Sequence, residues 1–117
     1  MPLLFLRLRR RFSLHIALLA GAVFMWVGVA DASIRVACVG DSITAGSGVR
    51  DRPLNSYPSQ LARLLGGEYE VRNFGVSGAT MLHRGDRPYI QQRAYADALA
   101  FRPEIVLIAL GTNDSKH

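Results

Sequence analysis

The sequence lacks a second cysteine, because Cys38 is the single thiol among its 117 residues. An internal disulfide is therefore excluded. Cys38 lies inside the apolar run Ile34–Gly40, so we expect it to be a small buried core residue. Internal repeats and low-complexity linkers are also missing. At this length the chain is expected to form one domain at most.

Three motifs that mark common α/β proteins are absent as well. The sequence contains no G-x-G-x-x-G and no G-x-x-x-x-G-K-[ST], so neither a dinucleotide site nor a P-loop is predicted. It also contains no G-x-S-x-G elbow, which argues against an ordinary α/β-hydrolase.

What is present at the amino terminus has the order of a secretory signal. A positive region comes first, formed by Arg7, Arg9, Arg10 and Arg11. The apolar run Ile16–Val29 follows, and Ala30, Asp31 and Ala32 form a small-x-small cleavage pattern. We expect residues 1–32 to be a signal peptide, the mature chain to begin at Ser33, and the protein to be secreted or periplasmic. The alternative is an uncleaved membrane anchor, although the run is shorter than the roughly 20 residues of a spanning helix.

The predicted signal carries most of the excess positive charge. The whole chain has 14 Lys and Arg against 9 Asp and Glu. Residues 1–32 hold four of the former and one of the latter, which leaves ten against eight, a net charge of +2. No basic run with interleaved aromatic residues remains in the mature part, so a nucleic acid is not expected as a partner.

The mature part alternates apolar strands with amphipathic helices. Strands are predicted at Ile34–Gly40, Tyr69–Phe74 and Glu104–Leu110. One helix is predicted with Pro58 in its first turn and Gly66 and Gly67 at its end. A second helix is predicted to open at Pro88 and stop before Pro103, with an apolar stripe of Ile90, Ala94, Ala98 and Phe101. This alternation predicts an α/β fold, a parallel sheet covered by helices on both faces.

Each predicted strand is followed at once by a short polar motif. The motifs are GDSIT (Gly40–Thr44), GVSGAT (Gly75–Thr80) and GTND (Gly111–Asp114). In a parallel sheet the carboxyl ends of the strands lie at one edge, where ligands bind. We therefore expect Ser42, Gly78 and Asn113 to meet there. A hydroxyl, a backbone N–H beside a glycine and a side-chain amide are the groups that acyl transfer needs, one as nucleophile and two as oxyanion donors.

Each motif alone has a simpler interpretation. GDS is a common turn sequence, a glycine after a strand often meets a backbone requirement, and an Asn-Asp pair is often a helix cap. A flavodoxin-like or nucleotide-binding sheet can carry any one of them. The three together, in this order and spacing, are what favours a hydrolase.

The three motifs together closely resemble those of the SGNH (GDSL-type) hydrolase family, over about residues 34–116. The resemblance implies that Ser42 is the nucleophile and that Gly78 and Asn113 are oxyanion donors. It implies a flavodoxin-like sheet of strand order 2-1-3-4-5, here represented by strands 2-1-3. It also implies hydrolysis of esters or thioesters through an acyl-serine, without a metal or other cofactor. GDSI in place of GDSL is a conservative difference.

The family's fourth block, D-x-x-H, follows a fifth strand and supplies the general-base histidine. Here a D-x-x-H match, Asp114 to His117, begins one residue after Asn113. We interpret it as a coincidence and expect residues 33–117 to be a partial domain, truncated after the third strand and inactive alone. His15 belongs to the predicted signal, and His83 is expected to be a solvated or substrate-rim residue.

The sequence therefore predicts an exported serine ester hydrolase. The flanking segments SYPSQLARLL and HRGDRPY look most like secreted members that act on acylated carbohydrates. Its expected partner is a small ester, with a membrane involved only if the signal is not cleaved. Two alternatives stay open: an inactive secreted fragment or carbohydrate-binding relic, and a lysophospholipase or thioesterase of the same family.

Overall fold

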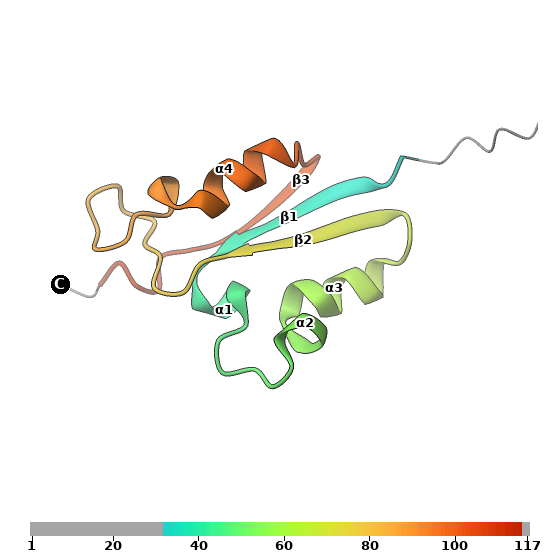
Figure 1. Ribbon diagram of the computed structural model, residues 1–117, viewed down its shortest axis with the longest axis horizontal. Helices are drawn as coiled ribbons and strands as arrows, with labels where there is room; N and C mark the ends of the chain where they lie inside the picture. Colours follow the sequence, from blue (N-terminus) through green and yellow to red (C-terminus); the bar gives the residue numbers. More distant parts are fainter. Residues whose placement is uncertain (1–31, 116–117) are drawn as a thin grey trace, which may run out of the picture. The chain divides into compact units, whose positions relative to one another are not determined.

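The computed structural model describes residues 32–115, so most of the predicted signal peptide, as well as Lys116 and His117, lies outside the described residues. Three parallel strands form one sheet in the order β2-β1-β3 (Figure 1). They are β1 (Ile34–Gly40), β2 (Tyr69–Gly75) and β3 (Ile105–Ala109). This arrangement confirms the predicted parallel α/β sheet and its 2-1-3 order.

The helices lie on both sides of this sheet. They are α1 (Ser42–Ala45), α2 (Arg52–Asn55), α3 (Tyr57–Leu65) and α4 (Arg93–Ala100), with a 3₁₀ turn η1 (Tyr89–Gln91) before α4. β2 and β3 flank β1 on opposite sides, and because crossovers between parallel strands are right-handed, α3 and α4 must cover opposite faces. Figure 1 shows α4 on one side and α1 to α3 on the other.

The first predicted helix is found as α3, but the prediction for the second was wrong at its start. Pro88 caps only the 3₁₀ turn η1, and extended backbone at Gln92 separates that turn from α4. The break turns the side chain of Tyr89 inward, where it is 3% exposed, and leaves Ile90 43% exposed. Of the predicted stripe, Ala98 and Phe101 are buried, and Ala94 packs against the same core.

The core lies between the sheet and α4. Its buried members are Ala37, Val39, Ala79, Tyr89, Ala98 and Phe101. The rings of Phe74 and Phe101 extend it, with centroids 5.7 Å apart. Because side chains alternate along a strand, Val36 and Cys38 face the other side, and both are buried. The prediction that Cys38 is a buried core thiol is confirmed.

The outer strand β3 is exposed over its whole length among the described residues. The large apolar side chains on it, from Ile105 to Ile108, are 40–65% exposed. Among the described residues β3 therefore presents an exposed apolar edge.

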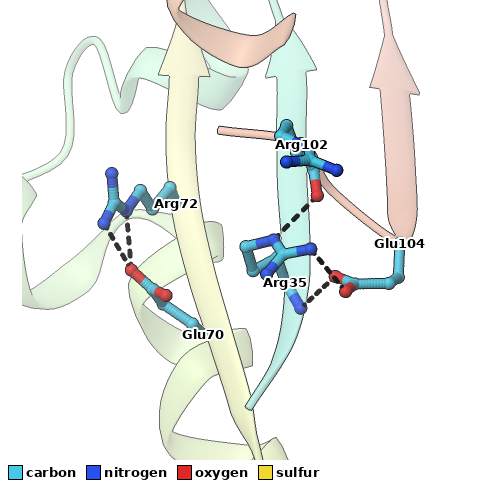
Figure 2. A network of polar contacts seen from close by, with 5 residues as sticks. All are labelled: Arg35, Glu70, Arg72, Arg102 and Glu104. Carbon is cyan, nitrogen blue, oxygen red and sulfur yellow. Dashed lines mark hydrogen bonds and ion pairs between the residues drawn. The ribbon is translucent and has the colours of Figure 1, made fainter. Parts of the chain in front are cut away.

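Charged residues fix the amino-terminal edge of the sheet (Figure 2). The guanidinium of Arg35 donates to Glu104 Oε1 at 2.6 Å and to the carbonyl oxygen of Arg102 at 2.7 Å. The backbones pair too, since the N–H of Glu104 donates to the carbonyl of Arg35 at 2.9 Å. These bonds hold the start of β3 in register with β1, at the edge opposite the polar motifs. A second pair, Arg72 and Glu70, lies on β2.

No helix within residues 32–115 has the length and apolar character needed to cross a membrane.

Candidate active site

The three polar motifs follow strands that end at one level of the sheet. Gly40, the last residue of β1, is in register with Gly75 on one side and with Ala109 on the other. The chain leaves the sheet after each of these residues, so the three loops share its carboxyl edge. The structure thus brings together the loops that carry Ser42, Gly78 and Asn113, with the loop of Ser42 in the middle.

Ser42 stands in the first turn after β1. The fully buried side chain of Asp41 accepts the N–H of Ile43 at 2.9 Å and so caps α1, the short helix that begins at Ser42. The Ser42 carbonyl accepts the N–H of Ser47 at 2.8 Å, which closes the loop. Ser42 itself is half-buried, and within residues 32–115 its hydroxyl makes no hydrogen bond. The backbone around Ser42 is therefore fixed on both sides by hydrogen bonds.

Two glycines allow α1 to lie directly on the strand ends. A Cβ at Gly40 would stand 2.0 Å from Thr44 Oγ1, and one at Gly75 would stand 2.2 Å from the backbone nitrogen of Ala45. Both distances are far inside van der Waals contact. The glycines that begin the first and the second motif therefore have a packing reason, namely the close approach of the helix that carries Ser42.

Asn73 ties the first loop to the second. Its Nδ2 donates to the carbonyl of Thr44 at 2.7 Å, and its Oδ1 accepts the N–H of Gly75 at 2.8 Å. A second link is formed between the hydroxyls of Ser47 and Ser77, whose oxygens are 2.8 Å apart. The loop of Ser42 and the loop of Gly78 are thus joined by side chains as well as by the strands.

The second loop is a tight turn over Val76–Ala79. It is closed by the N–H of Ala79, which donates to the carbonyl of Val76 at 3.1 Å. Gly78 occupies the third position with φ of 78°. A positive φ at that position is the mark of a type II turn and is strained for residues with a side chain.

The third loop binds to the second. Asn113 is 6% exposed, and its Nδ2 donates to the carbonyl of Ala79 at 3.0 Å. The next side chain, Asp114, accepts the N–H of Met81 at 2.8 Å through Oδ1. Asn113 is therefore placed beside the turn that contains Gly78, as the sequence predicts for two groups of one site.

A buried polar cluster lies behind the loop of Ser42. The hydroxyls of Thr44 and Tyr57 are 3.2 Å apart, and Cys38 is close enough to hydrogen-bond Tyr57. Burial raises the pKa of the Cys38 thiol, an effect that the bond to Tyr57 partly offsets. Burial likewise raises the pKa of Tyr57, and the nearby Asp41 carboxylate adds to the rise. Cys38, Thr44 and Tyr57 pack beneath the loop of Ser42.

His83 is the one histidine among residues 32–115. It is exposed and makes no hydrogen bond with another described residue. Within the same residues no group of three His, Cys, Asp or Glu side chains is placed to hold a metal ion. His117 lies outside the described residues.

Residues 38–117 match the GDSL-like lipase/acylhydrolase family. The chain belongs to this family. The predicted resemblance is therefore confirmed over the part of the sequence that contains all three motifs.

An acetylxylan esterase from Xylanibacter ruminicola is 57% identical to this GDSL-family chain over 84 residues. That alignment covers 72% of the chain and 18% of the esterase. The chain thus spans less than a fifth of the length of this relative.

Three residues that support the site in this GDSL-family chain were missed in the sequence. Asp41 is recognisable afterwards as an N-cap residue directly before a helix. Asn73 follows Arg72 in a strand that also contains Glu70, so no pattern marks it out from its polar neighbours. The third, Arg87, lies in a loop rich in charge and has no local pattern that indicates a partner at Ser77, ten residues earlier.

Proposed function

We propose that this protein is a serine ester hydrolase in which Ser42 is the nucleophile. The observation that carries the proposal is the common register of Gly40, Gly75 and Ala109. It brings three family motifs to one edge of the sheet with the serine on the central strand. Family membership supports the same chemistry.

In the proposed reaction, Ser42 Oγ attacks the carbonyl carbon of the ester. Its proton passes to a histidine base, and negative charge develops on the former carbonyl oxygen. Collapse of this intermediate expels the alcohol, which takes the proton back, and leaves an acyl-serine. Water, deprotonated by the same base, then releases the acid.

The developing oxyanion is assigned to the N–H of Gly78 and to the side-chain amide of Asn113. Donors held in place before the reaction stabilise such charge without reorganisation. The bond from Asn113 to Ala79 supports this assignment, because it fixes the amide beside the turn of Gly78.

We assign the histidine base to a D-x-x-H block outside residues 32–115, and not to the pair Asp114 and His117. Asp114 Oδ1 already accepts the N–H of Met81, which binds that carboxylate to the second loop. Within residues 32–115 no hydrogen bond or ion pair orients the exposed His83 toward Ser42 as a base.

For the substrate we propose an acetylated carbohydrate, namely a plant polysaccharide such as xylan. We also propose that the enzyme is exported. The support is the acetylxylan esterase that shares 57% identity over 84 residues and the signal-like order of residues 1–32. A preference for acetyl over long-chain esters in a chain-length series of 4-nitrophenyl esters would separate this assignment from a lysophospholipase.

The test of the nucleophile is covalent labelling of the full-length protein by a fluorophosphonate. We expect the wild type and Ser33→Ala to be labelled and Ser42→Ala to stay unlabelled. Ester hydrolysis should be lost in Ser42→Ala and kept in Ser33→Ala. Ser33 is the control because it precedes β1, at the opposite edge of the sheet. Equal labelling of all three proteins would overturn the proposal.

A further inference from the structure

The direction of the Gly78 N–H is not set by the turn that contains it. Type I and type II turns share the same closing hydrogen bond and differ by a flip of their central peptide, here the one between Ser77 and Gly78. Glycine at the third position accepts both signs of φ at little cost. The bond from Ala79 to Val76 therefore closes the turn in either state, but the N–H of Gly78 points in opposite directions in the two.

An arginine holds this peptide in one of the two states. Arg87 Nη1 donates to the carbonyl oxygen of Ser77 at 2.9 Å. In a trans, planar peptide the C=O and the following N–H point in opposite directions. The guanidinium that fixes the oxygen of Ser77 therefore also fixes the N–H of Gly78, aimed away from Arg87. A positive charge at the oxygen polarises the amide and strengthens its N–H as a donor.

Arg87 is itself fixed, although its side chain is exposed. Its Nε donates to Gln92 Oε1 at 3.3 Å, and Gln92 is anchored in turn through Nε2 to the carbonyl of Pro88 at 3.1 Å. The backbone carbonyl of Arg87 accepts the N–H of Thr80 at 2.9 Å. This last bond ties the backbone of Arg87 to Thr80, the residue that follows the turn. The side chain of Arg87 is therefore held close enough to bond the carbonyl oxygen of Ser77.

We propose that Arg87 is a positioning residue for the oxyanion site: it selects the peptide orientation in which the Gly78 N–H serves as donor. The inference rests on the proposed function, since it gives Gly78 that role. It assigns Arg87 no contact with the substrate. An arginine that instead bound an acidic group of the substrate would affect binding of the ground state and leave the Gly78 peptide unchanged.

The test compares Arg87→Met, which removes the donors but keeps a long side chain, with Arg87→Lys, which keeps the charge. Arg93→Met is the matched control, because Arg93 is an exposed arginine at the start of α4 whose one ion pair among the described residues is to Asp97. The full-length proteins are measured for kcat and KM with 4-nitrophenyl acetate. They are also measured for affinity toward a boronic acid that forms a tetrahedral adduct with a serine, and for the ¹⁵N amide signal of Gly78.

For Arg87→Met we expect kcat and boronate affinity to fall together, by at least about tenfold and at most the 10²–10³-fold that loss of one oxyanion donor costs. KM should stay within about twofold, because an interaction made only in the transition state does not alter it. The Gly78 signal should shift. Arg87→Lys should lie between Arg87→Met and the wild type in kcat, in boronate affinity and in the position of the Gly78 signal. Arg93→Met should match the wild type in all three.

Unchanged kcat and an unmoved Gly78 signal in Arg87→Met would overturn the inference, as would a rise in KM with kcat preserved. Failure of the proposed function gives a different result. In that case Ser42→Ala would keep its activity, whatever Arg87→Met does. A global loss of folding would appear as a lowered melting temperature in Arg87→Met. In that case kcat and the Gly78 signal are compared between Arg87→Lys and the wild type instead.

Discussion

Asn113 and Ala79 join the third loop of the site to the second: the buried Nδ2 of Asn113 donates to the carbonyl oxygen of Ala79 at 3.0 Å. The two residues are separated by 34 positions in the sequence and by the whole of α4. One amide hydrogen is committed to this bond. We assign the same amide to the oxyanion site, which would make a single side chain both a structural link and a catalytic donor.

Replacing Asn113 by alanine should therefore affect both rate and stability. We expect kcat for acetyl ester hydrolysis to fall by roughly 10²–10³ through loss of the donor. Stability should fall by about 1–3 kcal/mol, because a buried carbonyl loses its partner. Steady-state kinetics and urea unfolding measure the two effects. Asn55→Ala is the control, since Asn55 also bonds a backbone carbonyl, that of Arg50, but at an exposed position. Equal rates in both variants would contradict the assignment.

Adding a methyl group at Gly40 should destabilise the fold severely. The new Cβ would stand 2.0 Å from Thr44 Oγ1 and 2.7 Å from the carbonyl oxygen of Ala109, so α1 or β3 must move. Overpacking of this kind costs about 1–3 kcal/mol or more. Gly67→Ala is the matched control because nothing lies within 4 Å of its added Cβ. Urea midpoints should separate the two variants, and a Gly40→Ala protein as stable as Gly67→Ala would show that the close approach of α1 is not required.

Cys38 should report unfolding by its reaction with thiol reagents. It is fully buried, so a reagent cannot reach the sulfur in the native protein. Burial also raises the pKa of the thiol, so little of the reactive thiolate is present. We expect Ellman's reagent to react slowly at neutral pH and rapidly above the urea midpoint. Because Cys38 is the single cysteine, the absorbance of the thionitrobenzoate that Ellman's reagent releases reports on this one thiol. Rapid, stoichiometric reaction of the native protein would contradict the buried position.

Tyr89 should make stability fall at alkaline pH. Its hydroxyl donates to the carbonyl oxygen of Phe74 at 2.6 Å, and burial raises the pKa of the phenol to about 12. The folded state thus holds the proton more tightly than the unfolded state, whose tyrosine has a pKa of about 10. The resulting stabilisation is complete below about pH 10 and is lost as the pH rises toward 12.

The measurement for Tyr89 is the urea midpoint between pH 9 and pH 12, compared with Tyr89→Phe. At pH 9 the variant should be less stable by about 0.5–1.5 kcal/mol, the usual net contribution of one hydrogen bond. The difference between the two proteins should shrink as the pH rises. Parallel curves would show that this phenol does not titrate with unfolding.

Sequence patterns predicted β1 and β3 well because both are largely apolar runs that end close to a glycine. The end of β1 at Gly40 and the end of α3 before Gly66 were both predicted to the residue. The start of α4 was not, because the break before it comes from a tertiary contact. Burial of Tyr89 and its bond to Phe74 favour a 3₁₀ turn over the helix that local periodicity predicts.

The placement of the three loops at one edge was predicted to the extent that topology determines it. Parallel strands bring their carboxyl ends together whatever their side chains do, so spacing alone places Ser42, Gly78 and Asn113 at one edge. Which atoms bond across the loops depends on rotamers and on distances of a few ångströms. The bonds of Asn73 to Thr44 and of Arg87 to Ser77 are of this kind and leave no periodic trace in the sequence.

The central position of β1 has a consequence for the order of synthesis. β1 is the first strand made, yet its pairing is completed only by β3, where Val36 meets Ile105. At the roughly 5–20 residues per second of ribosomal elongation, the intervening stretch of about 70 residues takes on the order of 4–14 s. During that interval one side of β1 offers unpaired backbone groups to any other extended chain. Until β3 is made, the strand that precedes Ser42 is thus open to mispairing and to capture by a chaperone.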